Sequence, residues 1–306
     1  MRVRGAVKSL LETGLVWSGG AALCRAALDR HALVLAYHNV VPDDTPPFGD
    51  RPLHLPRRAF VRQIERLLRC HSIVPLDEVL MPAPARSRPR VAITFDDAYR
   101  GAVLLGIEEL ARRGVPASVF VVPGFVGEGP LWWDAVTGES GGIDSGVRAH
   151  ALERLAGRDR DVRCWAAAQG LPVRAVPEWG RLASEVELRA ATRHPGITLG
   201  SHTWSHPNLT RLPPDELRQE LSRSLEWLRE RYDRAIPWVS YPYGLTSPDV
   251  EAAAVAAGYE AGLALGGGWF APPSANRYAL PRSNVPAGLS LNGFVLRVSG
   301  LVRARA

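Results

Sequence analysis

A parallel β/α barrel is the fold that the sequence predicts. Short buried apolar runs alternate with helical periodicities along most of the chain, and this alternation is typical of a parallel sheet, open or closed. Polar residues able to do chemistry come directly after the apolar runs: His38, Asp96, Asp97, His202, His206 and Tyr243. In a β/α barrel the carboxyl ends of the strands meet at one face, where active sites form. This placement favours a barrel over a doubly wound sheet.

The elements follow from the spacing of apolar residues and from the residues that interrupt it. Apolar runs predict strands over 32–37, 72–76, 91–95, 118–122, 197–199 and 238–241. Helical spacing predicts helices over 56–70, 101–113, 213–231 and 248–257. Gly114 and Gly258 are placed to end two of these helices, and Pro242 ends the last strand. We expect one barrel domain over 31–306.

The stretch from about 127 to 195 does not fit the alternation. It contains Trp132 and Trp133, a Gly/Ser-rich turn over 138–146, and charged helical segments. We interpret it as a helical subdomain inserted between two barrel strands. It would either cover a groove or decorate the surface.

Composition indicates a globular protein without a nucleic-acid partner. The 306 residues are 46% hydrophobic and 22% charged, with a net charge of +6. One lysine, Lys8, and 36 arginines supply the positive charge, and the arginines are scattered among acids rather than interleaved with aromatics. Cys24, Cys70 and Cys164 form no CxxC pair and no disulfide framework. The sequence does not indicate an oligomeric state.

The first 30 residues predict an N-terminal amphipathic helix or extension. Positive charges precede a mostly apolar stretch, but Glu12 interrupts it and Arg25 lies where a signal peptide would be cleaved. The stretch is also too short and too polar to span a membrane. We therefore expect a cytoplasmic protein whose first helix packs on the domain or rests on a membrane surface as a peripheral anchor.

Two adjacent carboxylates, Asp96 and Asp97, end the apolar run 91–95. Two such carboxylates repel each other when both are ionised, and a metal on one relieves the other. We expect Asp97 to bind a metal and Asp96 to take a proton from a metal-held water. Taken alone, an Asp-Asp pair is more often a turn or a helix cap.

Two imidazoles, His202 and His206, follow the apolar run 197–199. The four-residue spacing would put both rings on one side of a helical turn. One carboxylate and two imidazoles leave open positions on a divalent metal, which distinguishes catalytic sites from structural ones. The other histidines lack such context, and we expect them at the surface: His31, His54, His71, His150 and His194.

Three motifs together resemble the polysaccharide deacetylase family, which shares the NodB homology domain. They are Thr-Phe-Asp-Asp at 94–97, Ser-His-Thr-Trp-Ser-His-Pro-Asn-Leu-Thr at 201–210 and Tyr-Pro-Tyr-Gly at 241–244. The resemblance implies a deformed (β/α)7 barrel and a divalent ion, usually zinc, with cobalt, nickel or iron suited to the same ligands. It also implies that Asp96 is the general base, that Asp97, His202 and His206 are metal ligands, and that the Tyr243 backbone N–H is an oxyanion donor.

The sequence departs from the family pattern at four places. Ala98 replaces a usual glycine, and an Asp-Trp motif is missing. Ser240 stands where many members have an arginine that pairs with the base; Arg282 is a candidate to replace it, or else a surface residue. The C-terminal Leu-x-His is also missing, so His38 is the candidate general acid, or else a buried structural histidine. A histidine at the start of the domain resembles the circularly permuted exopolysaccharide (poly-N-acetylglucosamine) deacetylase branch.

The predicted reaction is hydrolysis of an acetyl group, N-acetyl before O-acetyl, on an amino-sugar-containing polysaccharide or glycan precursor. Tyr243, Trp204 and Trp269 are candidates to stack on sugar rings, although tryptophan is more often a core residue. Two alternatives are a metal-dependent amidase acting on a small-molecule C–N bond and a non-catalytic glycan-binding relative. A two-His-one-carboxylate iron oxygenase fits less well, because its carboxylate lies close to the first histidine in sequence.

Overall fold

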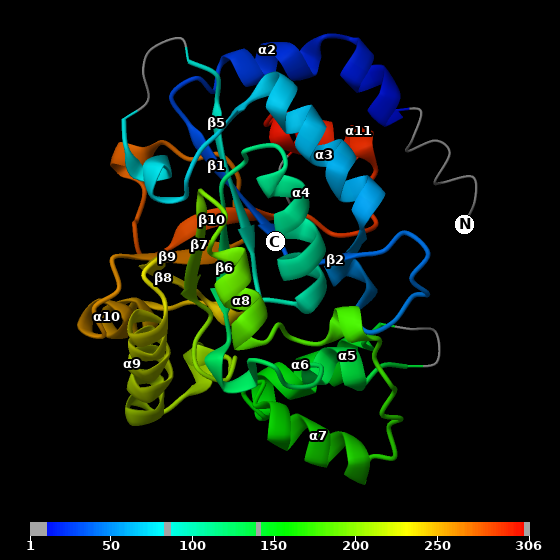
Figure 1. The fold of residues 1–306 in the computed structure, drawn as a ribbon, viewed down its shortest axis with the longest axis vertical. Helices are drawn as coiled ribbons and strands as arrows, with labels where there is room; N and C mark the ends of the chain where they lie inside the picture. The colour runs from blue at the N-terminus through cyan, green and yellow to red at the C-terminus, as the bar shows by residue number, and fades with distance from the viewer. Residues whose placement is uncertain (1–10, 83–86, 139–141, 303–306) are drawn as a thin grey trace.

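Seven parallel strands form a closed barrel in the computed structural model, which describes residues 11–82, 87–138 and 142–302 (Figure 1). In order round the barrel the strands are β1 (Ala32–Tyr37), β5 (Arg90–Phe95), β6 (Ala117–Val121), β7 (Ile197–Ser201), β8 (Ala235–Ser240), β9 (Ala261–Leu265) and β10 (Leu280–Asn284). The ring closes where β1 pairs with β5, from Ala32 opposite Arg90 to Tyr37 opposite Phe95. The predicted (β/α)7 barrel is confirmed.

Three short strands lie outside the ring. β4 (Ser72–Ile73) pairs with the first residues of β5, whereas β6 pairs with the last ones. The strand predicted over 72–76 is therefore only two residues long. β2 (Asn39–Val41) and β3 (His54–Pro56) form a separate parallel pair directly after β1.

Alternate residues of the strands face two different apolar layers. Inside the barrel, Val34 packs in a cluster with Phe120. Outside it, Leu35 packs in the main core with Phe60 and Phe294, which come from the covering helices. Both faces of the strands are buried, and this is why parallel strands appear in a sequence as continuous apolar runs rather than as alternating patterns.

Helices cover the outer surface of the barrel. They are α3 (Arg57–Cys70), α4 (Ile107–Ala111), α8 (Glu185–Ala191), α9 (Pro214–Arg231), α10 (Pro248–Ala256) and α11 (Leu291–Val298). The helix predicted over 101–113 begins with a π-helical turn, η3 (Ala102–Gly106), before α4. Its first turn packs closely on β2: a Cβ at Gly101 would lie 2.2 Å from the Val40 carbonyl oxygen.

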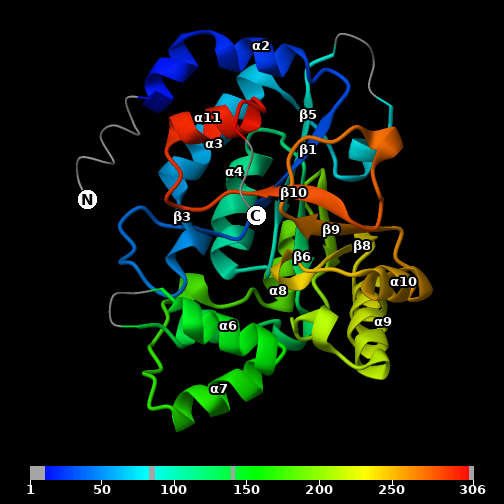
Figure 2. The same cartoon turned by 180° about the vertical axis from the view of Figure 1, so that it is seen from behind.

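The connection between β6 and β7 contains the segment expected as an insertion. After β6 come α5 (Trp132–Ala135), α6 (Ser145–Arg154) and α7 (Asp159–Ala168), which lie together at the lower end of the molecule in both views (Figures 1 and 2). α8, by contrast, contributes Leu188 to the main core. α8 is thus the covering helix of this crossover, and 139–141 of the predicted turn lie outside the described residues.

The start of the chain forms two short helical segments. Residues 11–17 are helical, and α2 (Gly20–Ala26) follows. Leu11, Trp17 and Leu23 are 64, 84 and 75% exposed. Among the described residues we find no helix with the length and apolar character needed to cross a membrane. The positively charged start, 1–8, is outside the described residues.

Candidate active site

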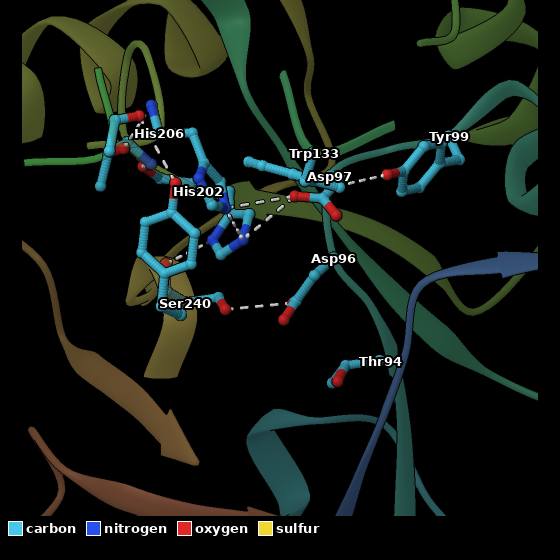
Figure 3. Close-up of polar contacts among 12 residues, drawn as sticks. Thr94, Asp96, Asp97, Tyr99, Trp133, His202, His206 and Ser240 are labelled. Carbon is cyan, nitrogen blue, oxygen red and sulfur yellow. Dashed lines mark hydrogen bonds and ion pairs between the residues drawn. The ribbon is translucent and has the colours of Figure 1, made fainter. Parts of the chain in front are cut away.

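Asp96 and Asp97 follow the last residue of β5, and their side chains diverge (Figure 3). Both are buried, at 2 and 1% exposure. The Asp96 carboxylate lies beside Ser240, while that of Asp97 faces the two histidines that follow β7. The left-handed backbone of Asp97, with φ 68°, turns the chain as the strand ends. Adjacent carboxylates thereby acquire separate partners.

The structure brings together the three side chains predicted as metal ligands. The Nε2 atoms of His202 and His206 lie 3.5 and 3.3 Å from Asp97 Oδ1 and 3.1 Å from each other. All three possible ligand atoms are within 4.8 Å of one another. His202 Nδ1 lies 2.6 Å from the backbone oxygen of Ser240. When Nδ1 donates to that oxygen, Nε2 keeps a free lone pair for a metal.

The electrostatics of this group fit a divalent cation. Burial, followed by the charges of Asp96 and Asp134, raises the pKa of Asp97 well above its usual range. Burial lowers the pKa of His202, and it lowers that of His206 well below the usual value. Asp97 Oδ1 is buried without a hydrogen-bond partner among the described residues, which is costly. A divalent cation would satisfy this oxygen and both neutral imidazoles while leaving open positions.

The two histidines do not lie on a helical turn, and that part of the sequence prediction is wrong. The segment between them is an irregular loop in which Thr203 and His206 have positive φ values of 65° and 61°. Side chains hold this loop: Ser201 Oγ accepts from the Thr203 N–H, and Thr203 Oγ1 accepts from the His206 N–H. Glu220 accepts further bonds from the same loop. The rings converge because these contacts fold the loop back on itself.

Arg282 forms a two-pronged ion pair with Asp96 inside the barrel. Its Nη1 and Nη2 atoms donate to Asp96 Oδ1 and Oδ2, each at 2.8 Å. Nη2 also donates to Ser240 Oγ at 2.8 Å, and Ser240 in turn donates to Asp96 at 3.0 Å. Burial alone would raise the pKa of Asp96, but the charge and hydrogen bonds of Arg282, together with the charges of His202 and His38, outweigh it and hold this pKa far below its usual range. Asp96 is therefore a fixed, ionised carboxylate.

A cavity of about 380 Å³ opens over these groups. The sequence-predicted residues that line it are His38, Asp96, Asp97, His202, His206 and Tyr243. His38 follows β1 directly. Burial lowers its pKa to about 4, although the nearby charge of Asp96 acts in the opposite direction. His38 is consequently neutral at pH 7 in the free site.

Backbone strain is concentrated in the segments that carry these side chains. Among the described residues, six that are not glycine have positive φ, and five of them belong to this site: Asp97, Ala98, Thr203, His206 and Tyr243. Each such conformation costs about 1 kcal/mol or more, and residues of this kind cluster at functional sites. Ala98, with φ 55°, occupies a conformation that a glycine would adopt without strain.

Two of the predicted sugar-stacking residues do not line the cavity. The Trp204 ring is covered instead by Arg223, whose guanidinium carbon lies 3.6 Å from the ring centroid. Trp269 stacks on His71 on the outside of the barrel, with ring centroids 5.9 Å apart. His54 and His71, expected at the surface, are buried at 7 and 4% exposure. Each has a buried partner: His54 Nε2 lies 3.0 Å from Asp134 Oδ1, and His71 Nε2 lies 3.0 Å from the Val298 backbone oxygen.

The opposite wall of the cavity consists of residues that the motifs did not reveal. They are Asp50, Pro52 and Leu53 from the segment before β3, and Trp133, Arg148 and Leu152 from the inserted helices. On the barrel side, Asn284 at the end of β10 lines the cavity as well. Asn284 Oδ1 is buried with no hydrogen-bond partner among the described residues. Asn284 follows Arg282 and Ser283 rather than an apolar run, so no pattern in the sequence marks it. Nothing in the sequence marks the others.

A buried polar network holds Trp133 at the edge of the candidate metal group. The Trp133 ring lies 4.7 Å from the His206 ring, and its Nε1 donates to Tyr99 Oη at 2.8 Å. Tyr99 donates to Asp134 Oδ2 at 2.5 Å, and His54 Nε2 lies 3.0 Å from Asp134 Oδ1. Asp134 is fully buried. The network therefore joins the inserted segment to β3 and to the segment that follows Asp97.

Comparisons with known proteins agree with this arrangement. Residues 83–262 match the family model for polysaccharide deacetylase. The putative polysaccharide deacetylase YxkH of Bacillus subtilis (strain 168) is 29% identical over 111 residues, which is 36% of this chain and 39% of that protein. The chain thus spans well under half the length of this curated relative.

Solved structures share the fold at low sequence identity. The Streptococcus pyogenes deacetylase PplD, in complex with acetate, aligns with a TM-score of 0.60 and 15% identity over 88% of this chain and 98% of that one. IcaB from Ammonifex degensii aligns with a TM-score of 0.61 and 17% identity, over 88% of this chain and 97% of that one. The BpsB deacetylase domain from Bordetella bronchiseptica aligns with a TM-score of 0.57 and 18% identity, over 84% of this chain and 96% of that one. Since the family model covers more than half of its length, this chain belongs to the polysaccharide deacetylase family.

Proposed function

We propose that this protein is a metal-dependent hydrolase that removes acetyl groups from an amino-sugar-containing polysaccharide or glycan precursor. N-acetyl groups are the favoured substrate, ahead of O-acetyl groups. The observation that carries the proposal is the division between two adjacent acids. Asp97 converges with two neutral imidazoles, whereas Arg282 holds Asp96 ionised and separate from them. Membership of the deacetylase family supports the same reaction.

In this proposal Asp97, His202 and His206 hold the cation. A bound divalent ion, zinc first and cobalt, nickel or iron as alternatives, supplies a polarised water and positive charge for the developing oxyanion. Asp96 acts as the base. Its ionised state and its orientation are fixed by two bonds from Arg282 and one from Ser240, so that it can accept the proton of the attacking water.

His38 is proposed to protonate the leaving sugar amine. It is neutral in the free site, so it must gain a proton during the reaction. The negative charge of Asp96 favours the protonated form of His38, and both residues line the same cavity. In this proposal the proton taken up by Asp96 reaches His38 within that cavity.

The backbone N–H of Tyr243 is proposed as a donor to the oxyanion. Tyr243 follows β8 in a strained turn with φ 58°. Its ring is held in place by the Trp132 indole, whose Nε1 donates to Tyr243 Oη at 3.2 Å. A donor fixed in advance needs no rearrangement when charge develops on the substrate oxygen. We place Trp133, rather than Trp204 or Trp269, beside the bound sugar.

The test is acetate release from N-acetylated and O-acetylated oligosaccharides by the full chain, measured with added metal and after chelation. Asp96→Asn should lower the rate by about 10²–10⁴-fold while retaining the metal, since it removes the base but no ligand. Asp97→Asn should lose both metal and activity. Asp215 is an exposed acid on α9, and Asp215→Asn is the matched control, which should change neither the metal content nor the activity. Full activity of Asp96→Asn would overturn the assignment of the base.

The same assay separates the two competing functions. A metal-dependent amidase would release ammonia from small amides and no acetate from oligosaccharides. A non-catalytic glycan-binding relative would bind the oligosaccharide, with or without metal, and release neither product.

A further inference from the structure

A second cavity, of about 410 Å³, lies on the outer side of the barrel wall. Arg282 on β10 faces the barrel interior, so the next residue, Ser283, faces outward, and it lines this cavity. The glycine run 266–268 after β9 and Arg297 on α11 form further walls. The described part of the β9–β10 connection contains a single 3-10 turn, η8 (Pro272–Ser274), instead of a covering α-helix, and this leaves the outer layer open.

Several side chains that line the cavity have buried polar atoms without a hydrogen-bond partner among the described residues. Ser283 is 1% exposed, and its Oγ has no partner among the described residues. The same holds for the buried atoms Trp269 Nε1 and His31 Nδ1. The Arg297 guanidinium donates to the backbone oxygen of Asn284 and forms no ion pair within the described chain. Leaving several buried donors unpaired is costly, so this cavity is built for a ligand rich in acceptors.

Among the described residues that line the cavity, the charged side chain is the positive one of Arg297. The lining contains no acidic side chain among the described residues. Burial first, and then the charges of Arg25, Arg66 and Arg88, lower the pKa of His71, which stacks on Trp269. Burial also lowers the pKa of Arg297, because no anion stabilises its charge there. The field therefore favours a negatively charged group.

The glycine run lets the backbone approach such a group. Gly266 has φ 93°, and a Cβ at Gly267 would lie 2.0 Å from Pro281 Cβ, so neither position accepts a side chain easily. A Cβ at Gly268 would meet no atom within 4 Å. The Gly267 N–H already donates to the Arg282 backbone oxygen at 3.4 Å, so the room for an anion lies at Gly268.

We propose that this cavity binds the phosphate group of a phosphate ester. A guanidinium, an indole N–H, a hydroxyl and an imidazole offer donors in several directions, and phosphate has enough acceptor oxygens to use them together. The volume exceeds that of phosphate alone and leaves room for an attached organic group. The phosphate could be supplied by a soluble ester or by a phospholipid headgroup, and both sources share this chemistry. The proposal does not depend on the deacetylase reaction.

The experiment measures binding to the full chain at constant ionic strength. Inorganic phosphate and glycerol 3-phosphate are titrated by calorimetry, with chloride as the control anion. Flotation with phosphatidylcholine vesicles, with and without phosphatidic acid, tests the lipid source. Arg297→Met should weaken phosphate binding by about tenfold or more, because a charge-assisted bond is lost. Trp269→Phe, which removes only the N–H and keeps a ring, should weaken it roughly threefold. Arg218→Met, at an exposed site on α9, should have no effect.

The outcomes are distinct. If the full chain binds the free phosphates, and both Arg297→Met and Trp269→Phe weaken that binding, the ligand is a soluble ester. If it binds only vesicles with phosphatidic acid, and both variants weaken that binding, the ligand is a lipid headgroup. No binding of either kind overturns the proposal. Binding that Arg297→Met and Trp269→Phe leave unchanged overturns it too, since it would reflect an adventitious ion only. Circular dichroism and thermal unfolding verify that each variant is folded; if Arg297→Met is not, the Trp269→Phe result decides.

Discussion

The two walls of the candidate catalytic cavity differ in origin and in how they are held. The barrel wall carries Asp96, His202 and their neighbours at the ends of strands, fixed by buried hydrogen bonds and strained backbone. The opposite wall comes from the loop before β3 and from the inserted helices. Its ion pair between Arg148 and Asp50 is partly open to solvent, with side-chain exposures of 38 and 11%. We infer that the barrel wall determines the chemistry and the inserted wall determines which glycan enters.

The largest effect is expected on the barrel wall, at His38. His38→Gln removes the proposed proton donor, and acetate release should fall by about 10²–10⁴-fold with little change in KM. Steady-state kinetics on an N-acetylated oligosaccharide measure it. His150→Gln is the control, because His150 stacks on Trp165 outside the cavity, with ring centroids 4.3 Å apart. A loss of only a few-fold would mean that another group protonates the amine.

Arg282→Met tests the fixed carboxylate of the same wall. It leaves Asp96 buried and unpaired, so the free energy of unfolding should fall by about 3–5 kcal/mol. The sign of the pH dependence should also change. With Arg282, the lowered pKa of Asp96 stabilises the fold above the ordinary carboxyl pKa. Without it, burial raises this pKa, and the variant loses stability as the pH rises through the carboxyl range. Urea unfolding at mildly acidic and neutral pH distinguishes the pH dependence of Arg282→Met from that of the unmodified protein, with Arg218→Met as control.

Asp134→Asn tests the junction between the walls. Asp134 accepts hydrogen bonds from Tyr99 and from the Asp50 N–H, at 2.5 and 2.9 Å, so the substitution should cost about 1–3 kcal/mol of unfolding free energy. It should also lower the rate of acetate release, since Trp133 loses its support beside His206. Urea unfolding and kinetics measure the two effects. Unchanged values in both would show that this network does not hold the inserted segment.

The smallest effect is expected on the inserted wall. Arg148→Gln should raise KM roughly threefold without changing kcat, because a partly exposed ion pair contributes little energy. Arg154→Gln is the matched control, since Arg154 is exposed on the same helix and does not line the cavity. If kcat in Arg148→Gln also fell roughly threefold, Arg148 would act in the reaction itself, and the inferred division of roles between the two walls would be wrong.

The fold was predictable where the strands are rich in large or branched apolar residues. β1 and β5 are such runs and lie where expected. β9, with the sequence AGLAL, was missed because alanine and glycine give no clear strand signal. The π-helical turn before α4 was missed as well, since it reflects close packing on β2 rather than local spacing. The side chains of the insertion that reach the cavity had no signal, because their role depends on packing across the chain.

By itself, the sequence determined the barrel class and the acids and imidazoles available to a metal, since these depend on short spacings along the chain. Only the tertiary structure decided how they are used. It placed Arg282 on Asp96 across 186 residues, removed Trp204 and Trp269 from the cavity, and brought Trp133 to His206. The physical reason is barrel closure. Which distant side chains meet inside a ring depends on strand order and register, and no local pattern encodes these.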